Sequence, residues 1–457
     1  MEFFCDLLSS LAPWLLVLTM GCSLLILLLR GCAEPFAPGI AFGSLVRRLV
    51  NHQRLDSNLP GEGSAASRQL RRRLRRNEWA MHTQLRLIVW IACVMLLSRL
   101  LILAAAMIGS CLSASLDKLF TAAISHWVRW DAANYVNLAR NGYKTLPELL
   151  YLLPLYPLLV RLFSYLCFGH YVFAGFLVSN ISLMGASWAL YHVINDQYGE
   201  RSARRAVMLM LFSPLSLFFS VPSAESLFLM LTLLAILCAR NRWFGAAVVF
   251  GMLASATRLI GFLVFIPIYM EVLKYLHCLD LFERRRSRYF VLLALYTLLC
   301  LVIFLGTGSY LIINRVIGGH PFAFVSTLAE EWNESFVSIR NTQAYSIQLA
   351  FNYGSLDWQL GTWLPQALVI FVSAMMLLAY STTMPPADGL YAWLYLFLTM
   401  APSWMLSGPR TVTSLYPIYM MLAVVSRKKW TYLIIMLLSI ILMCCFAYMY
   451  ALVGSVV

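Results

Sequence analysis

A single carboxylate beside a tryptophan is the side chain of this sequence that is best placed to act as a base. Asp131 follows Trp130 in a segment whose aromatic and apolar residues recur at helical spacing up to Gly142. An amphipathic helix of this kind lies along a membrane surface, where a lowered dielectric raises the pKa of a carboxyl toward useful base strength. Asp131 is therefore a candidate general base. The alternative is that Asp131 only caps the helix.

Three further charged residues lie within or beside apolar stretches. Glu225 heads one apolar run, Arg258 interrupts another, and Arg410 follows a Ser-Gly-Pro turn. Ionisable groups in such places are costly unless they are paired or functional, and arginine matches the geometry of phosphate and carboxylate groups. Arg258 and Arg410 are thus candidates for binding a phosphate. For Glu225 the alternative is helix initiation, with Ser223 as the cap and the acid favoured by the helix dipole.

The composition places most of the chain in lipid. Of its 457 residues, 61% are hydrophobic and 12% are charged, and the mean hydropathy is +0.76. Water-soluble chains are roughly 45–50% apolar and roughly 25% charged, so a soluble enzyme, a disordered chain and a disulfide scaffold are excluded. The eleven cysteines show no C-x-x-C pair and no Cys/His ligand spacing, which predicts small buried side chains rather than a metal site.

The surplus of basic residues is explained by membrane insertion. The formal net charge is +14, and ten arginines but only three acids fall between Arg47 and Arg86. Lys and Arg are retained on the cytosolic side, so this region is predicted to be a cytosolic linker that contacts anionic lipid. No nucleic-acid-binding module accompanies the charge, which excludes nucleic acid as a partner.

Basic clusters in the rest of the chain predict its topology. They occupy breaks between apolar runs at 201–205, 240–242, 284–288 and 427–429. If all of them face the cytosol, the opposite side receives the loops at 111–171, 223–224, 315–362 and 407–410. Asp131 and Arg410 then lie on the same, non-cytosolic side. The sequon Asn333-Glu334-Ser335 falls on that side too, which agrees weakly with a lumenal loop.

The apolar runs predict an all-α polytopic membrane protein. Since about 20 residues cross the hydrocarbon as a helix, the runs give about 10–13 transmembrane helices. They lie at 7–29, 87–108, 172–194, 206–222, 225–240, 243–257, 259–275, 289–314, 363–381, 389–406, 411–425 and 431–453. Three regions follow: an N-terminal membrane anchor at 1–32, a basic cytosolic linker at 33–86, and a multispanning domain at 87–457 that carries the amphipathic helix in a lumenal loop.

Five short motifs follow one another in order along the chain. They are Trp130-Asp131 with Gly142-Tyr143, Pro154-Leu155-Tyr156-Pro157, Phe212-Ser213-Pro214, Ser223-Ala224-Glu225-Ser226-Leu227-Phe228 and Thr257-Arg258. As an ordered set over about residues 85–453 they resemble the GPI mannosyltransferase 2 (PIG-V) family of the glycosyltransferase C superfamily. The resemblance implies a multi-pass enzyme of the endoplasmic reticulum membrane with a lumenal active site and a glycosyltransferase C-type fold.

The resemblance also implies a reaction and its substrates. The family adds the second, α1,6-linked mannose to the GPI-anchor precursor. The donor is dolichyl-phosphate mannose, and the acceptor is a mannosyl-glucosaminyl-phosphatidylinositol in the lipid bilayer. A donor with a single phosphate requires no metal, and no cofactor is implied. A small membrane subunit is left open as a partner.

Residue roles follow from the positions that match the family motifs. Asp131 matches the acid of the first lumenal loop and becomes the general base of an inverting transfer, with Trp130 beside it. Arg258 or Arg410 is the candidate for the leaving phosphate, and Glu225 is assigned to substrate binding. Two further substrate-binding assignments depart from the pattern. The family often has His-Trp-Asp, whereas His126 here stands one turn before the acid, and Glu148 lies near the family's second acid but in a shifted register.

Other functions fit the same sequence. Another polyprenyl-phosphate-sugar-dependent glycosyltransferase is the nearest of them. A transporter or lipid scramblase would be expected to show paired broken helices and inverted repeats, and neither is evident here. A non-catalytic assembly subunit of the same pathway would not need Asp131.

Overall fold

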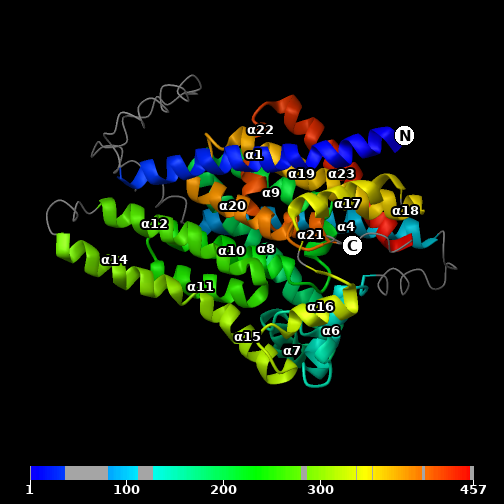
Figure 1. Ribbon diagram of the computed structural model, residues 1–457. Helices are drawn as coiled ribbons and strands as arrows, with labels where there is room; N and C mark the ends of the chain where they lie inside the picture. The colour runs from blue at the N-terminus through cyan, green and yellow to red at the C-terminus, as the bar shows by residue number, and fades with distance from the viewer. Residues whose placement is uncertain are drawn as a thin grey trace.

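The fold is a bundle of helices with a smaller lobe at one end (Figure 1). A computed structural model describes residues 2–36, 81–111, 127–278, 286–335, 337–352, 354–403 and 407–452. Within these ranges the chain forms helices and connecting loops, without a β-strand. The lobe contains α6 (Asp131–Asn141), η3 (Pro147–Leu149), α7 (Leu155–Leu166) and α16 (Ala323–Trp332).

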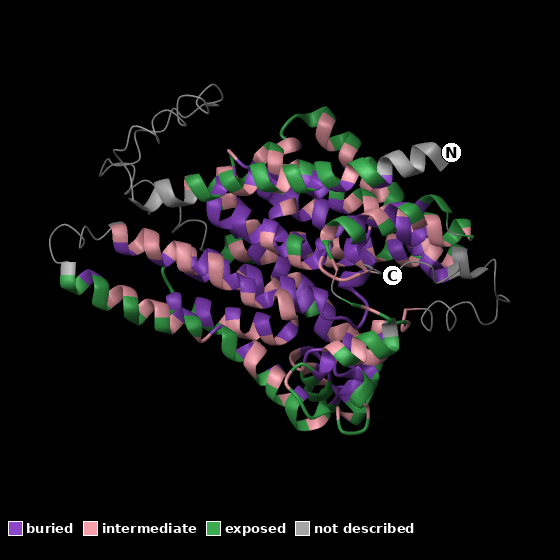
Figure 2. Cartoon of the chain, in the orientation of Figure 1, coloured by how far each residue is buried: buried purple, intermediate pink, exposed green. Residues whose placement is uncertain are grey.

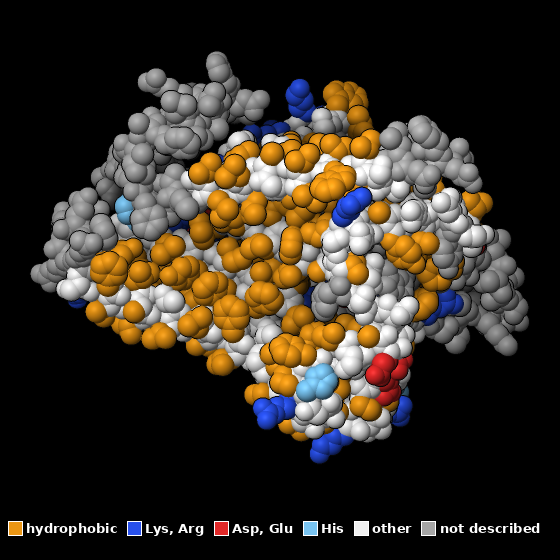
Figure 3. Space-filling model, viewed as in Figure 1, with side chains coloured by type: hydrophobic (Ala, Val, Ile, Leu, Met, Phe, Trp, Pro, Cys, Tyr) orange, Lys and Arg blue, Asp and Glu red, His pale blue; other side chains and the backbone are white. Residues whose placement is uncertain are grey.

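Seven helical stretches of the described residues are long and apolar enough to cross a membrane. They are α1 (Glu2–Phe36), α4 (Met81–Cys111), α8 (Tyr171–Tyr198), η5 (Leu259–Val264) with α12 (Phe265–Cys278), α14 (Arg286–Leu301) with α15 (Phe304–Gly318), α18 (Leu356–Trp358) with η6 (Gln359–Trp363) and α19 (Leu364–Tyr380), and α23 (Lys429–Leu452). They carry exposed leucines such as Leu96, Leu298 and Leu438. Exposed positions follow these helices in Figure 2, and hydrophobic side chains cover much of the face seen in Figure 3. So much exposed apolar surface requires lipid, which confirms an all-α polytopic membrane protein.

Five of the predicted apolar runs form shorter helices. They are α9 (Glu200–Leu211), α10 (Glu225–Arg240), α11 (Phe244–Thr257), α20 (Pro386–Thr399) and α22 (Tyr416–Val425). Most side chains of α10 and α20 are buried, and α10 packs between α8 and α11 (Figure 2). The number of helices of spanning length is therefore seven among the described residues, below the 10–13 predicted from sequence. The difference arises because an apolar run is equally compatible with burial in protein and in lipid.

Helix α1 belongs to the bundle rather than forming a separate anchor. It packs against α17 (Ile339–Asn352), α19 and α20. The Trp393 indole N–H donates to Ser23 Oγ at 2.6 Å, and Arg30 donates to the backbone carbonyls of Ser381 and Met384. The predicted anchor at 1–32 is thus integrated with the multispanning domain.

The predicted linker at 33–86 is shorter at both ends. Residues 33–36 belong to α1 and residues 81–86 to α4, while residues 37–80 lie outside the described part of the chain. The basic sequence at 71–76 lies within that part. Arg86 lies on α4, where helical residues continue directly into the apolar span.

Residues 212–224, which include the short η4 (Ser216–Phe219), connect α9 to α10 inside the bundle. Arg99 of α4 donates to the carbonyl of Ser216 at 2.6 Å, to Ser220 Oγ at 2.7 Å and to the carbonyl of Leu211 at 3.3 Å. Backbone groups that leave a helix within a membrane must find such partners, because no water reaches them. Arg99 therefore fixes the segment that positions the start of α10.

The start of α10 differs from its predicted form. The N-cap residue is Ala224, and no side chain caps the helix. Ser223 Oγ donates instead to the carbonyl of Phe218 at 2.8 Å, so the predicted Ser223 cap is wrong. Glu225 does occupy the first turn, as predicted, which leaves its carboxylate at the positive end of the helix dipole.

The far end of α10 is held by a buried ion pair. Arg240 Nη2 lies 2.7 Å from Asp388 Oδ2, and the Tyr416 hydroxyl donates to Asp388 Oδ1 at 2.6 Å. Arg240 also donates to the carbonyl of Val193 at 3.0 Å. The Asp388 side chain is 2% exposed and that of Arg240 is 11% exposed. This network joins α10, α20, α22 and α8 at the end of the bundle opposite Glu225.

Replacing Asp388 with Ala is expected to destabilise the fold strongly. The change leaves Arg240 buried without its counter-charge, which costs about 3–5 kcal/mol. The midpoint of thermal unfolding in detergent should fall well below that of the wild type. Glu200→Ala is the matched control, since it removes an exposed pair with Arg204 that contributes about 0–1 kcal/mol. Equal, small shifts for both variants would contradict the prediction.

Candidate active site

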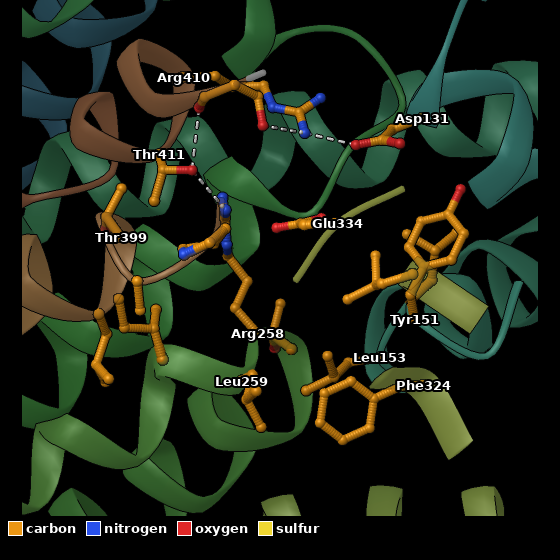
Figure 4. A pocket seen from close by; sticks show the side chains of 18 of the residues that line it. Asp131, Tyr151, Leu153, Arg258, Leu259, Phe324, Glu334, Thr399, Arg410 and Thr411 are labelled. Carbon is orange, nitrogen blue, oxygen red and sulfur yellow. Dashed lines mark hydrogen bonds and ion pairs between the residues drawn. The ribbon is translucent and has the colours of Figure 1, made fainter. Parts of the chain in front are cut away.

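A cavity of about 530 Å³ lies where the smaller lobe meets the bundle. Its walls come from the start of α6, the start of α10, η5, α15, α16, the end of α20 and α21 (Gly408–Thr413). Charged and polar side chains gather on one side of the cavity, whereas Leu153, Leu259 and Phe324 form an apolar side (Figure 4). The cavity therefore offers a polar reaction zone and an apolar surface in one space.

Two acids and two arginines form a continuous network on the polar side. Arg410 Nη2 lies 2.5 Å from Asp131 Oδ2, and Arg410 Nε lies 3.2 Å from Glu225 Oε1. Arg258 Nη1 lies 3.1 Å from the same Glu225 oxygen. Arg258 Nη2 donates to Thr411 Oγ1 at 3.1 Å (Figure 4). Opposite charges alternate, so that the four side chains have no net charge.

Asp131 is the first residue of α6, and its carboxylate does not cap that helix. The N-cap residue is Trp130, with φ 52 and no side-chain hydrogen bond to the helix start. The helix ends at Asn141 with Gly142 at φ 78 as its C-cap, which confirms the predicted stop. The predicted amphipathic helix therefore exists but begins at Asp131. Its carboxylate is directed to Arg410, which removes the capping alternative.

Trp130 has a backbone conformation that is unusual for a residue with a Cβ. Its φ of 52 is positive, with ψ −131, and this conformation is strained for a residue other than glycine. Such strained residues are concentrated at functional sites. The Trp130 ring packs edge-to-face on Trp358, with 6.4 Å between the centroids. Trp130 lines the cavity, so the strained backbone sits directly beside the Asp131 carboxylate.

Arg410 is the more enclosed of the two arginines. It contacts Asp131 and Glu225, its Nη2 donates to Ser407 Oγ at 3.3 Å, and its side chain is 10% exposed. Burial alone would lower the pKa of Arg410, but the carboxylates of Asp131 and Glu225 raise it above the ordinary value. Arg410 therefore stays positively charged, and its guanidinium is already paired with two protein carboxylates.

Arg258 lies at a break between α11 and η5. Its backbone is extended, at φ −141 and ψ 142, and its side chain is 18% exposed. At this break the Arg258 side chain lines the cavity (Figure 4). Arg258 contacts one carboxylate, whereas Arg410 contacts two. Of the two predicted phosphate ligands, Arg258 is thus the more accessible to a bound molecule.

Two of the predicted site residues are not part of this cluster. His126 lies outside the described residues. Glu148 is exposed on η3 and lines a separate hollow of about 370 Å³ together with Asn134 and Glu331. The structure therefore brings together Trp130, Asp131, Glu225, Arg258 and Arg410, and leaves Glu148 outside their cavity.

One acid in the cavity was missed by sequence reasoning. Glu334 lines the cavity, although in the sequence it is distinguished only as the middle residue of a sequon. Burial raises its pKa to about 7. The only signal in the sequence was the predicted position of Glu334 in a lumenal loop. That signal is unspecific, because polar loops commonly contain acids. Asn333 beside it is exposed.

The described residues contain no group of three or more His, Cys, Asp and Glu side chains arranged to hold a metal ion. Comparison with known proteins provides no relative for this geometry: no family model, no curated protein and no solved structure matches the chain. The chemistry of the cavity must follow from its own side chains.

Proposed function

We propose that this chain is a glycosyltransferase C-type enzyme of the endoplasmic reticulum membrane. It transfers the second, α1,6-linked mannose of the GPI-anchor precursor from dolichyl-phosphate mannose. The observation that carries the proposal is the position of Asp131, which shares one cavity with two arginines and an apolar wall. The ordered motifs that resemble the GPI mannosyltransferase 2 family supply the choice of sugar, linkage and acceptor.

Asp131 acts as the general base. The acceptor is mannosyl-glucosaminyl-phosphatidylinositol, and its mannose 6-hydroxyl loses a proton to Asp131 as its oxygen attacks the anomeric carbon of the donor. The bond from that carbon to the phosphate oxygen breaks, and dolichyl phosphate leaves with the electron pair. Attack from the side opposite the phosphate converts the β-mannosyl donor into an α-mannoside. One carboxylate suffices, because the phosphate leaves without a general acid.

The two arginines have different roles in the proposed reaction. Arg258 stabilises the charge that develops on the leaving phosphate, because it is the more exposed cation and contacts only one carboxylate. Arg410 is a positioning residue, since it holds Asp131 through Nη2 and is itself held by Glu225. Glu225 contacts both arginines and keeps them in one arrangement.

The apolar side of the cavity suits a lipid-linked donor. Leu153, Leu259, Phe262 and Phe324 line it and are close to the polar network. A polyprenyl chain binds to such a surface while its phosphate reaches Arg258, which places the reaction at the bilayer edge. The basic loops define the cytosolic side, so the cavity faces the lumen in this proposal.

Profiling of GPI precursors in cells that lack this chain tests the proposed step. We expect a lipid with one mannose to accumulate, because the first mannose is added before this reaction and the next requires it. Reintroducing the wild-type chain should remove that lipid. Accumulation of a precursor with no mannose, or with two or three, would assign the chain to a different step.

A further inference from the structure

Glu334 is a charged side chain of the cavity to which the proposed mechanism gives no role. In Figure 4 it points into the space bounded by Asp131, Arg410 and Arg258. Among the described residues, no side chain forms an ion pair or hydrogen bond with its carboxylate, whereas both other acids of the cavity are paired. Partial enclosure of an unpaired acid is costly, and a bound molecule can offset this cost by supplying the missing partner.

The segment that carries Glu334 is held firmly. The backbone N–H of Glu334 donates to the carbonyl of Leu328 at 3.2 Å. The next residue, Ser335, accepts from the backbone N–H of Ser403 at 2.6 Å and donates to Ser403 Oγ at 3.0 Å. These bonds tie the segment to the end of α16 and to the chain that follows α20. The carboxylate is therefore presented to the cavity from a fixed backbone.

The charge balance of the cavity indicates which ligand suits Glu334. The other charged side chains that line the cavity are two acids and two arginines, whose charges cancel: Asp131, Glu225, Arg258 and Arg410. The tyrosines that line it are neutral: Tyr135, Tyr151 and Tyr310. An ionised Glu334 adds one uncompensated negative charge. A phosphate would be repelled by it, and both proposed substrates carry one, but only the acceptor also carries an amine. A single cation on the acceptor would balance it.

We infer that Glu334 binds the protonated amine of the acceptor's glucosamine and so selects acceptors in which that amine is free. The inference rests on the proposed function, which defines the acceptor as a mannosyl-glucosaminyl lipid. The mannose 6-hydroxyl meets Asp131, and the neighbouring amino sugar meets Glu334 across the same cavity. Glu334 acts in binding and specificity, not in the proton transfer.

The pH dependence follows from the state of the Glu334 carboxyl. Burial raises its pKa to about 7 in the empty cavity, so it is ionised above that pH and protonated below it. Only the ionised form pairs with an ammonium group. The KM for the acceptor should therefore rise as the pH falls below about 7, while an uncharged residue at this position should remove the dependence.

The test measures transfer by the purified full chain in lipid nanodiscs. The donor is a polyprenyl-phosphate mannose, and the two acceptors are mannosyl-glucosaminyl-phosphatidylinositol and its N-acetylated counterpart. For Glu334→Gln we expect the KM for the free-amine acceptor to rise about 10- to 100-fold with little change in kcat. The preference over the N-acetylated acceptor should disappear, together with the rise in KM at low pH. This substitution leaves the sequon Asn333-x-Ser335 intact.

Glu330→Gln is the matched control, since Glu330 is an exposed acid on α16 outside the cavity. It should keep the wild-type KM, preference and pH profile. The inference is overturned if Glu334→Gln retains the preference for the free amine, or if it lowers kcat at unchanged KM. Either result leaves the proposed function standing as long as the wild type transfers mannose. A wild type that transfers to neither acceptor overturns the proposed function and this inference together.

Discussion

The Asp131→Asn variant should fold but fail to transfer mannose. Loss of a positioned general base lowers turnover by about 10²- to 10⁴-fold. The amide has the same shape as the carboxylate, but it cannot accept the proton of the attacking hydroxyl. In cells that lack the wild-type chain, the variant should leave GPI-anchored proteins absent from the surface. A precursor with one mannose should accumulate, which lipid profiling by mass spectrometry can measure.

The Asp131 experiment needs a check on folding, because the side chain also pairs with Arg410. The thermal midpoint of the purified variant should stay close to that of the wild type. The side chain of Asp131 is 21% exposed, and the asparagine that replaces it is also polar. Asp357→Asn is the matched control, as Asp357 is an exposed acid on α18 outside the cavity. Full restoration of GPI anchoring by Asp131→Asn would instead favour a non-catalytic assembly subunit.

Replacing Arg258 with Ala should produce the second large loss. Removing a group that stabilises charge developing in the transition state lowers kcat by about 10²- to 10³-fold. Arg258→Lys should retain part of the kcat that Arg258→Ala loses, because lysine keeps the positive charge. Lysine lacks the planar guanidinium, whose two terminal nitrogens contact Glu225 and Thr411. Single-turnover transfer at saturating donor measures the effect on the chemical step.

Arg315→Ala is the control for the loss at Arg258, because Arg315 is an exposed cation in the last turn of α15, outside the cavity. If Arg258 binds the phosphate, the Arg410→Ala and Arg258→Ala variants should lose activity for different reasons. Arg410→Ala should impair the reaction by releasing Asp131, and it should also lower the thermal midpoint because Arg410 pairs with two acids. Normal turnover in Arg258→Ala, with a loss confined to Arg410→Ala, would move the phosphate to Arg410.

The individual charged residues of the site could be predicted from sequence, but their network could not. Asp131, Glu225, Arg258 and Arg410 stand out because charge beside apolar sequence is costly. Asp131 and Arg410 are 279 positions apart, and no local pattern shows that they touch. The order of contacts, in which one glutamate bridges both arginines, depends on how α6, α10, η5 and α21 pack.

Other features were inaccessible to sequence reasoning for different physical reasons. Hydropathy could not separate buried helices such as α10 from lipid-facing ones, since both exclude water. Nothing in the composition of the loop around Glu334 distinguishes that acid from its exposed neighbours. The strained backbone of Trp130 likewise has no sequence signal, because tryptophan gives no local preference for a positive φ.

The position of α1 has a consequence for biosynthesis. The hydrogen bond between Ser23 and Trp393 joins residues 370 positions apart, and the contacts of Arg30 are nearly as distant. Helix α1 therefore cannot complete these contacts until α20 has been translated. A nascent chain that stops before Ser381 would lack the bonds that Ser23 and Arg30 form with Trp393, Ser381 and Met384. Quality-control factors of the membrane would recognise such a product, so premature termination should yield degraded rather than partly active protein.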